Sequence, residues 1–278
     1  QTSIYLASSP EVIKITGGYF AKCRAVSPSK DAQNAVDAKR LWEISEKLSQ
    51  IFSTGVLAGC KVVVTAGPTH EAIDPVRFIT NGSSGKMGYA LAEAACEAGA
   101  TVTLISGPVH LPKPTQAIAT ISVLSAQDMY DAVMGKMVDC DIFLAVAAVG
   151  DYRCQTVATQ KIHKSAPTLQ IALERNVDIV HHVGQLSPKP FIVGFAAETE
   201  RVEEYARHKL SSKNLDMIAC NDVSRADIGF QSDDNAMTVF WRQGMLKLEK
   251  APKSHIARQL VAVCAQQLLT ETDHEITS

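Results

Sequence analysis

The stretch KVVVTAGPTHEAIDPVRFITNGSSGKMGYALAEAACEAGATVTLISGP, residues 61–108, decides the fold class. An apolar, β-branched run at 62–65 predicts a buried strand, the pattern at 88–99 predicts a helix, and the apolar run at 101–106 predicts a second strand directly after it. Continuous apolar strands separated by helices are typical of a parallel sheet covered on both faces. We therefore expect a doubly wound, Rossmann-like α/β fold, in which ligands bind beyond the carboxyl ends of the strands.

The same alternation continues toward the carboxyl terminus. It predicts strands at 119–123, 141–146, about 169–173, 191–195 and 216–220, and helices at 128–138, 178–185, 199–212 and about 254–269. Two further runs, 236–242 and 245–249, predict a β-hairpin that turns at Gln243-Gly244. Residues 59–270 are thus expected to form one α/β domain with a small hairpin extension, followed by a polar tail at 271–278 that frays.

Residues 1–58 do not share this alternation. Apolar residues at helical spacing predict one helix at 39–52, whereas the residues before it are polar and rich in turns. Ser53-Thr54-Gly55 then breaks the pattern. We expect residues 1–58 to be an appendage to the α/β domain.

The composition restricts the class of partner and compartment. With 27 basic and 29 acidic residues the chain is nearly neutral, so no overall field attracts nucleic acid or an anionic membrane. No stretch indicates a membrane span or a signal peptide. Seven cysteines without a CxxC pair are typical of reduced thiols. We expect a cytoplasmic protein that binds neither nucleic acid nor membranes.

The loop before the first helix could bind an anion. The small residues from Asn81 to Gly85 let backbone N–H groups approach a ligand, and the amino end of a helix favours negative charge. The string is not a Walker A motif, because Met87 follows Lys86, and it does not fit GxGxxG. A phosphate site and an ordinary strand-to-helix turn both stay open.

Three other positions could contribute polar groups to the same edge of the sheet. Asp151 follows the strand expected at 141–146, where a carboxylate can bind a sugar, a base or Mg²⁺, or simply cap a loop. Lys209 and Lys213 lie four apart on a predicted helix, so a triphosphate could bridge them, although most lysine pairs are merely solvated. His181-His182 is not expected to bind metal, since adjacent helix positions point in different directions. The metal ligands are unknown.

Several strings from residue 59 to about 270 resemble, in the same order, the phosphopantothenoylcysteine synthetase domain of the bacterial bifunctional coenzyme A enzymes. They are TAGPTHEAIDPVRFITNGSSGKMG, AAVGDYR, KIHK, NVDIV, VGFAAET, KNLD and NDVSRADIGFQSDDNA. The resemblance implies a ligase of coenzyme A biosynthesis that uses CTP and Mg²⁺ to join 4′-phosphopantothenate to cysteine. The acid would attack the α-phosphate of CTP and release pyrophosphate, and the amine of cysteine would then displace CMP from the acyl-cytidylate. Such a covalent intermediate divides one difficult step into two easier ones.

The resemblance also implies roles for individual residues. Asn81 matches the asparagine needed to turn over the acyl-cytidylate, where an amide can donate to the developing oxyanion and accept from the amine. Arg77 would orient the acid or its intermediate, and Lys161 would neutralise charge at the α-phosphorus. Asp151 would contact the nucleoside and Phe195 the base. The implied nucleotide contacts are Ala145, Val146, Ala147, Asp151, Lys161, Val177, Asp178, Ile179, Val180, Phe195, Lys209 and Lys213.

The family further implies a homodimer and a flavin-dependent decarboxylase domain, which residues 1–58 do not resemble. Residues 1–52, and TGGYFAKCRAVSPSKDAQNAVDAKRLWEISEKL at 16–48 in particular, instead resemble the carboxyl-terminal tail of a short-chain dehydrogenase. In KIHK, His163 replaces a permanent cation of the family's KxKK string, so nucleotide affinity could depend on pH. Two alternatives stay open: an NAD(P)-binding oxidoreductase on the same fold and a catalytically dead nucleotide-binding protein.

Overall fold

The computed structural model describes residues 20–21, 24–25, 55–114, 117–163, 168–198, 201–222 and 232–277. The chain divides into two units, residues 1–53 and 54–278. In the first unit, the described residues form two short antiparallel strands, β1 (Phe20–Ala21) and β2 (Arg24–Ala25). The helix expected at 39–52 and most of the dehydrogenase-like tail lie outside the described residues, so both stay predictions.

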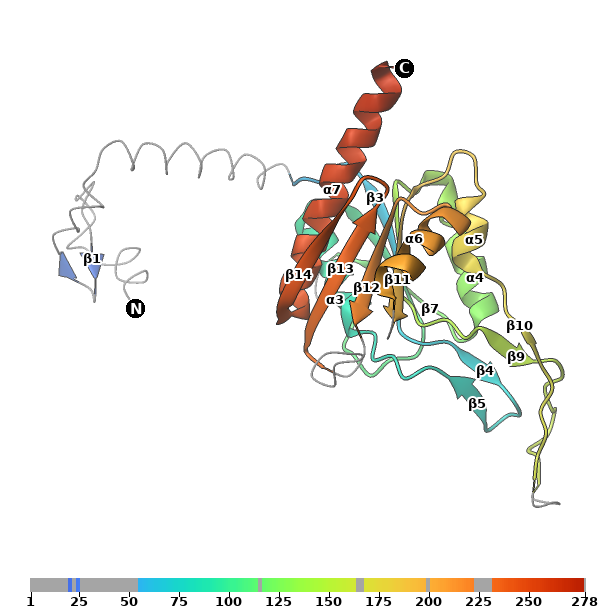
Figure 1. Cartoon of the computed structure of the whole chain (residues 1–278). Coiled ribbons are helices and arrows are strands. Elements are labelled where there is room, and N and C mark those ends of the chain that lie inside the picture. The colour runs from blue at the N-terminus through green and yellow to red at the C-terminus, as the bar shows by residue number, and fades with distance from the viewer. Residues whose placement is uncertain are drawn as a thin grey trace. The chain divides into compact units, whose positions relative to one another are not determined.

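The second unit is built on a sheet of eight described strands in the order β14-β13-β12-β11-β8-β3-β6-β7 (Figure 1). Six neighbouring strands run parallel to one another: β7 (Ala119–Ser122), β6 (Thr101–Ser106), β3 (Lys61–Ala66), β8 (Ile142–Ala145), β11 (Phe191–Glu198) and β12 (Met217–Asp222). Counted in chain order, these strands have the Rossmann arrangement 3-2-1-4-5-6. The predicted fold class is confirmed, and the strand order reverses direction between β3 and β8.

The predicted hairpin extends this sheet. Strand β13 (Asp234–Trp241) pairs antiparallel with β12, and β14 (Gly244–Pro252) pairs antiparallel with β13. Trp241 is opposite Gly244, so the turn residues are 242 and 243, one position earlier than predicted. A Cβ at Gly244 would lie 2.9 Å from the Trp241 ring, which explains why glycine occupies the paired position rather than the turn.

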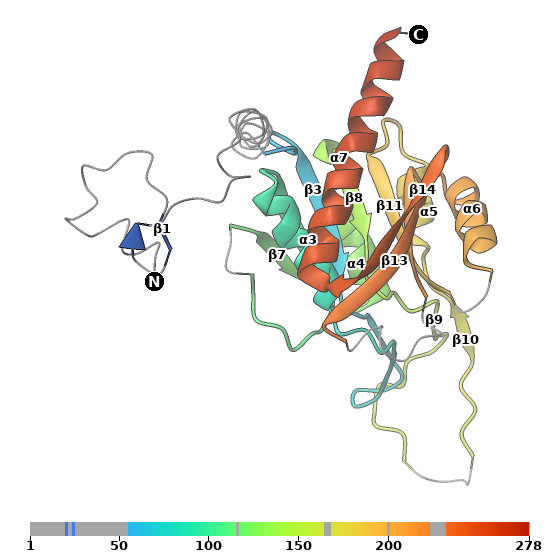
Figure 2. The same cartoon turned by 60° about the vertical axis from the view of Figure 1, so that its left-hand side comes forward.

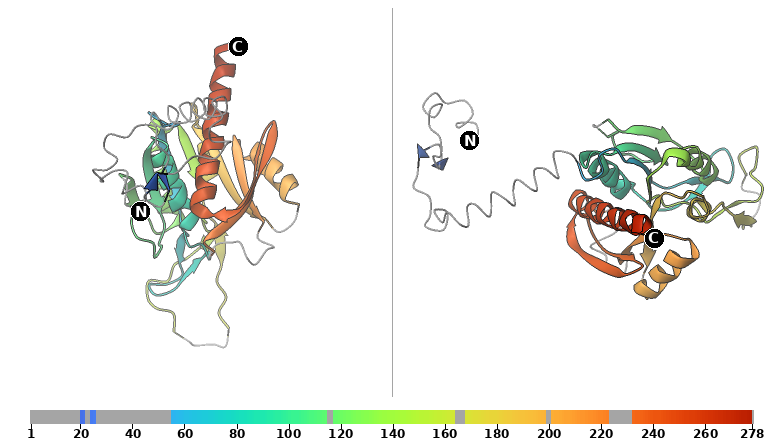
Figure 3. Two further views of the ribbon diagram at one scale, coloured as in Figure 1. Left: turned by 90° about the vertical axis from the view of Figure 1, so that its left-hand side faces the viewer. Right: turned by 90° about the horizontal axis from the view of Figure 1, so that it is seen from above.

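Helices cover both faces of the sheet (Figures 2 and 3). Helices α3 (Lys86–Glu97) and α7 (Lys253–Thr277) pack on one face, and α4 (Ala126–Met134), α5 (Ile179–Gly184) and α6 (Val202–Ser212) pack on the other. Because side chains of a strand alternate, Val62 and Val64 join the first core and Val63 joins the second. Burial of each such side chain contributes about 1.5–3 kcal/mol.

Most helix boundaries differ from those predicted by one to four residues, and the differences at α4 and α7 have identifiable causes. Helix α4 begins at Ala126 because Ser125 and Asp128 form a capping box, in which Ser125 Oγ accepts from the Asp128 N–H at 3.1 Å. Helix α7 does not end near 269 but continues to Thr277, since 270–277 contains neither glycine nor proline. The expected frayed tail at 271–277 is therefore helical. Within the described part of the chain, no helix has both the length and the apolar character that a membrane span requires.

Two small antiparallel strand pairs lie outside the main sheet and were not predicted. They are β4 (His70–Ala72) with β5 (Phe78–Thr80), and β9 (Tyr152–Cys154) with β10 (Leu173–Arg175). The strand expected at about 169–173 is thus β10, displaced toward 175 and absent from the parallel sheet. Both pairs project beyond the same end of the sheet (Figure 1).

Candidate functional site

A pocket of about 860 Å³ opens at the carboxyl ends of β3, β8 and β11. The strand order reverses between β3 and β8. The loops that follow these two neighbouring strands lead to opposite faces of the sheet, and this leaves a crevice between them. The pocket lies between the start of α3 on one face and α5 and α6 on the other. Its volume is in the range of small-molecule and cofactor sites.

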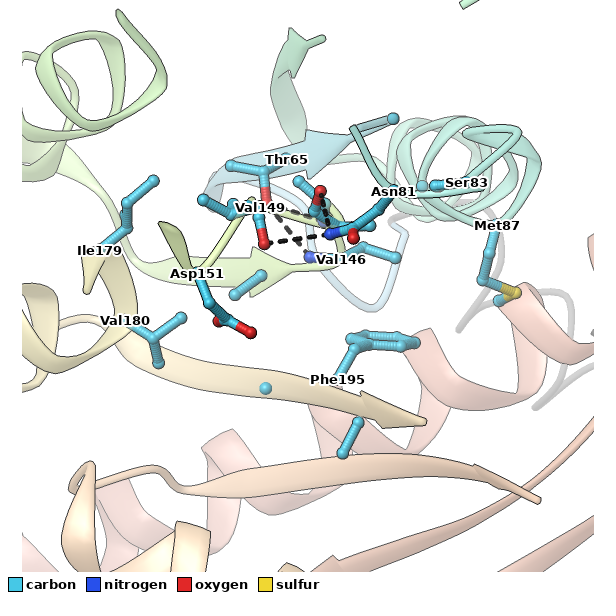
Figure 4. Close-up of a pocket in the computed structure, with 18 of the residues that line it drawn as sticks. Thr65, Asn81, Ser83, Met87, Val146, Val149, Asp151, Ile179, Val180 and Phe195 are labelled. Carbon is cyan, nitrogen blue, oxygen red and sulfur yellow. Dashed lines mark hydrogen bonds between the residues drawn. The ribbon is translucent and has the colours of Figure 1, made fainter. Parts of the chain in front are cut away.

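Most of the predicted site residues line this pocket. They are Asn81, Ala145, Val146, Ala147, Asp151, Val177, Asp178, Ile179, Val180, Phe195, Lys209 and Lys213. Figure 4 shows Asn81 on one side, Ile179 and Val180 on the opposite side, and Phe195 below Asn81 in this view. Segments that are far apart in sequence are therefore brought together as the fold class predicts. The role of each residue stays a prediction.

The hydroxyl of Thr65 holds the segment that follows β8. Thr65 is buried near the end of β3, and its Oγ1 accepts from the N–H groups of Val146 and Ala147 at 3.1 and 3.3 Å (Figure 4). Strand β8 ends at Ala145, so the N–H groups of Val146 and Ala147 are the first beyond the strand and need a partner outside the sheet. Thr65 thus fixes the pocket wall from the neighbouring strand, a role that sequence reasoning missed.

The side chain of Asn81 is fixed by the same wall. Its Nδ2 donates to the carbonyls of Ala148 and Val149 at 3.1 and 3.2 Å (Figure 4). Both amide hydrogens are engaged in this way, and the remaining functional atom, Oδ1, can only accept. In this conformation Asn81 can accept a further hydrogen bond at Oδ1, whereas its Nδ2 already donates to two carbonyls, and its catalytic role stays a prediction.

Asp151 lies in a turn that is held from two sides. The Gly150 N–H donates to Thr69 Oγ1 at 2.9 Å, while Asn176 donates from Nδ2 to the Gly150 carbonyl at 2.8 Å and from its N–H to the Asp151 carbonyl at 2.9 Å. The Oδ1 of Asn176 is buried and has no partner among the described residues. Asn176 therefore couples the Asp151 turn to the segment 177–180, which forms the next wall of the pocket.

The two predicted lysines of α6 lie at one end of the pocket. Lys213 Nζ is 3.0 Å from the carboxylate of Asp178, which also accepts from the His181 N–H and so caps α5. Burial alone would raise the pKa of Asp178, but the His181 N–H and the Lys213 ammonium lower it below its ordinary value. Asp178 is therefore ionised and is the partner of Lys213 in this structure. A phosphate that bound Lys213 would compete with the Asp178 carboxylate for it.

Arg77 and Lys161 do not line the described pocket. Arg77 instead donates to the buried carboxylate of Asp74 at 2.8 Å and to the Ile162 carbonyl at 3.1 Å. Burial opposes ionisation of Asp74, yet the N–H groups of Ile162, Val76 and Arg77 and the Arg77 charge lower its pKa. These contacts fasten the loop that carries Lys161 to the β4–β5 segment. Arg77 thus has a structural partner that the sequence did not indicate.

The start of α3 forms the opposite end of the pocket. Gly88 allows this approach, because a Cβ there would lie 2.6 Å from Cβ of Ala66 in β3. The helix begins after Gly85, which has φ +79° and offers no side-chain cap to the first turn. This end also includes Lys86 and Lys253, which sequence reasoning left without a role. No local signal marks Lys253, since it reaches the site only through the docking of α7.

Comparison with known proteins places residues 57–268 in the family of the DNA/pantothenate metabolism flavoprotein C-terminal domain. The chain is 52% identical over 229 residues to the Vibrio cholerae coenzyme A biosynthesis bifunctional protein CoaBC, covering 81% of this chain and 57% of that protein. The corresponding Escherichia coli protein is 50% identical over 195 residues, with 68% and 48% covered.

A solved structure agrees with these sequence matches. The C-terminal domain of a coenzyme A biosynthesis bifunctional protein CoaBC is 41% identical, has a TM-score of 0.67, and covers 78% of this chain and 99% of its own. The chain spans about half the length of the curated relatives described above. The resemblance carried by the sequence strings is confirmed. The chain belongs to the DNA/pantothenate metabolism flavoprotein C-terminal domain family.

Proposed function

We propose that this chain is a phosphopantothenate–cysteine ligase that activates the acid with CTP through an acyl-cytidylate. The observation that carries the proposal is the single pocket wall formed by 145–151, which is contacted by Asn81 from one side and Asn176 from the other. Family membership supports the reaction class, and the names of the bifunctional relatives support its place in coenzyme A biosynthesis.

The nucleotide would occupy the half of the pocket between β8, α5 and α6. Its base would pack near Phe195, its nucleoside would contact Asp151, and its phosphates would reach Lys209 and Lys213. Cationic side chains placed where charge develops on phosphate oxygens stabilise the transition state more than the ground state. The phosphates would have to share or displace the Asp178 carboxylate, which lies 3.0 Å from Lys213 Nζ.

Magnesium fits this arrangement as a companion of the triphosphate. Among the described residues no group of three His, Cys, Asp or Glu side chains could hold a metal by itself. The acidic side chains that line the pocket are Asp151 and Asp178, and Asp178 already pairs with Lys213. Mg²⁺ usually takes one or two carboxylates together with phosphate oxygens, so Asp151 is the residue that would hold it. The ion would supply charge neutralisation on the phosphates.

Asn81 would act in the second step. Because its amide N–H groups hold the carbonyls of Ala148 and Val149, its Oδ1 is directed by two hydrogen bonds and is suited to accept one from the amine of cysteine. Such a contact orients the nucleophile toward the activated carbonyl and reduces the entropic cost of bringing the two together. The first step does not require this group.

We also propose a homodimer, because the two predicted residues outside the pocket, Arg77 and Lys161, lie in the segments that connect β4 to β5 and β9 to β10. Phe78 in β5 and Leu173 in β10 are each nearly half exposed, so both strand pairs carry apolar surface that a second copy could cover. In a dimer, Arg77 and Lys161 of one copy could serve the pocket of the other. Analytical ultracentrifugation tests this proposal, and a monomer at the concentrations used for activity would remove it.

Decarboxylation of the ligase product is a separate, later reaction, and we propose that a flavin-dependent enzyme carries it out. The ligase itself is tested by measuring pyrophosphate with CTP, 4′-phosphopantothenate and cysteine. Pyrophosphate should appear only when the acid is present, and CMP and amide should follow when cysteine is added. Binding of CTP without pyrophosphate would identify a dead nucleotide-binding protein. Tight binding of NADPH, followed by its fluorescence, would favour the oxidoreductase. A panel of CTP, ATP, GTP and UTP decides the nucleotide.

A further inference from the structure

The loop that carries Asn81 holds a chemically reactive pair of residues. Asn81-Gly82 is the one Asn-Gly pair in the sequence, since every other asparagine precedes a residue with a side chain. Residues 81–84 belong to neither a helix nor a strand, and Asn81 and Gly82 are both exposed. Because glycine has no Cβ, its backbone nitrogen can closely approach the side-chain carbonyl carbon, Cγ, of a preceding asparagine. Attack of that nitrogen on Cγ is the first step of deamidation.

The Gly82 nitrogen is available for this attack. Among the residues that the structure describes, none accepts a hydrogen bond from the Gly82 N–H. Within a helix or a sheet this N–H would be held by a carbonyl, which keeps the nitrogen fixed and protonated. The surroundings are also open, because a Cβ built at Gly82 would meet no atom within 4 Å. Neither hydrogen bonding to the described residues nor packing opposes ring closure at this nitrogen.

Two hydrogen bonds restrain the side chain of Asn81. Its Nδ2 donates to the carbonyls of Ala148 and Val149 at 3.1 and 3.2 Å (Figure 4). Both bonds involve the nitrogen that leaves in deamidation, and neither engages Oδ1. A hydrogen bond between neutral groups is weak in net terms, so the released side chain is populated at equilibrium. We therefore expect the pocket wall to slow deamidation relative to the unfolded chain without preventing it.

We propose that Asn81-Gly82 is a site of spontaneous deamidation, and that the modification removes amide formation while CTP-dependent activation of the acid persists. The effect on activity rests on the proposed function. In the first step the Gly82 nitrogen loses its proton and bonds to Cγ of Asn81. Nδ2 leaves with that proton as ammonia, and the product is a cyclic imide.

Water opens the imide in the second step. Its hydroxyl adds to one of the two imide carbonyls, and its remaining proton returns to the Gly82 nitrogen. Cleavage of the bond to Cγ gives aspartate at residue 81, whereas cleavage at the backbone carbonyl gives isoaspartate. The sum is amide plus water to acid plus ammonia, so no oxidant, reductant or further reactant is needed.

Both products lose the donor that holds the pocket wall. An aspartate oxygen in place of Nδ2 would face the carbonyl oxygens of Ala148 and Val149, and acceptors cannot hydrogen-bond to one another. Isoaspartate also lengthens the backbone by a methylene just before α3. The hydrogen bonds of Thr65 and Asn176 to the same wall are not altered. The modified protein should therefore still activate the acid with CTP but should no longer orient the amine of cysteine.

The test ages the full wild-type chain and Gly82→Ala in mildly alkaline buffer prepared with heavy-oxygen water. Alanine keeps Asn81 and fits the open space, whereas its methyl group hinders the approach of the nitrogen to Cγ. Peptide mass spectrometry measures the converted fraction and the uptake of heavy oxygen, and an isoaspartyl methyltransferase detects isoaspartate. Asn176 and Asn214, in the same digest, are internal controls. Each aged sample is assayed beside a fresh sample of the same protein, so any effect of alanine itself cancels.

We expect the wild type to accumulate labelled aspartate and isoaspartate at residue 81, while Asn176 and Asn214 keep their amides. Conversion should be faster at higher pH, because the attacking nitrogen must lose its proton. The rate of amide formation should fall in proportion to the converted fraction. The pyrophosphate released in a single turnover should stay at the level of the fresh protein. Gly82→Ala should lose little of either activity over the same time.

Other outcomes overturn the inference. It fails if Asn81 of the folded wild type stays unmodified while the urea-unfolded chain is converted, or if wild type and Gly82→Ala are converted equally. Should Gly82→Ala not fold, the comparison of folded and unfolded wild type decides alone. Converted protein that forms amide at the full rate would refute the proposed effect on activity. If fresh wild type makes no amide, the proposed ligase is refuted, and the peptide masses still decide whether this site deamidates.

Discussion

Replacement of Thr65 by valine removes one hydroxyl and leaves the side-chain volume nearly unchanged. Thr65 is 3% exposed, and its Oγ1 accepts from the N–H groups of Val146 and Ala147 at 3.1 and 3.3 Å. Valine suits a strand, so β3 itself should persist. Both N–H groups would lose their acceptor at the base of the pocket. An unsatisfied buried donor costs about 1–3 kcal/mol, and water entering from the pocket can replace part of that loss.

We therefore expect Thr65→Val to lower the free energy of unfolding by about 1–3 kcal/mol in total. For a unit of this size, each kcal/mol lowers the Tm by roughly 2–4 °C. CTP affinity should fall by about tenfold if 1.4 kcal/mol of the loss concerns the orientation of the wall that contacts the nucleotide. Thermal unfolding and calorimetric titration with CTP measure the two effects.

Thr65→Ser is the matched control, because serine keeps the hydroxyl and loses only a methyl group. It should retain CTP affinity even if the loss of the methyl lowers the Tm slightly. Equal losses of CTP affinity in the two variants would show that packing of the methyl, rather than the hydroxyl, orients the wall. Unchanged stability and affinity in Thr65→Val would refute the role of these hydrogen bonds altogether.

Three further predictions concern Asn81, Lys161 and Asp74. Asn81→Asp should still release pyrophosphate and should accumulate the acyl-cytidylate in a quench assay, and an unchanged rate of amide formation would contradict its role. Lys161→Gln should slow pyrophosphate release by about tenfold or more, as loss of a phosphate contact does, and unaltered release would contradict that role. Folding lowers the pKa of the Asp74 carboxyl, so the ionised Asp74 stabilises the folded protein at pH values above its unfolded-state pKa. This stabilisation is lost as the pH falls through the folded-state pKa. Denaturation of wild type and Asp74→Asn between neutral and acid pH should show a stability difference that disappears with acidification; a constant difference would contradict the linkage.

The main sheet could be predicted because its signals are local. The run 101–106 coincides with β6, and 62–65 lies within β3, since a strand covered on both faces is rich in β-branched and apolar residues. The residues that follow such strands then meet at one edge by topology alone. This is why Asp151 and the α6 lysines could be assigned to one pocket before the structure was known.

The remaining features depend on tertiary contacts that a single sequence does not encode locally. Strands β4, β5, β9 and β10 have three residues each and mix polar with apolar side chains, so only their pairing defines them. Thr65 has the pattern of an ordinary β-branched strand residue, and only the structure shows the two N–H groups from which its hydroxyl accepts. Lys253 begins a helix far from the other site segments in sequence, and only packing of α7 against α3 brings it to the pocket.

The hydrogen bonds that hold the wall 145–151 bear on how the two proposed reaction steps could take place in one pocket. The wall 145–151 is held by Thr65 at its start, by Thr69 and Asn176 at Gly150, and by Asn81 at 148–149. Asn81 precedes α3 at one end of the pocket, and Asn176 belongs to the side proposed for the nucleotide. The mixed anhydride would form against this common wall. Because the same backbone orients both reactants, the intermediate need not move between the two steps, and cysteine needs only to reach Asn81.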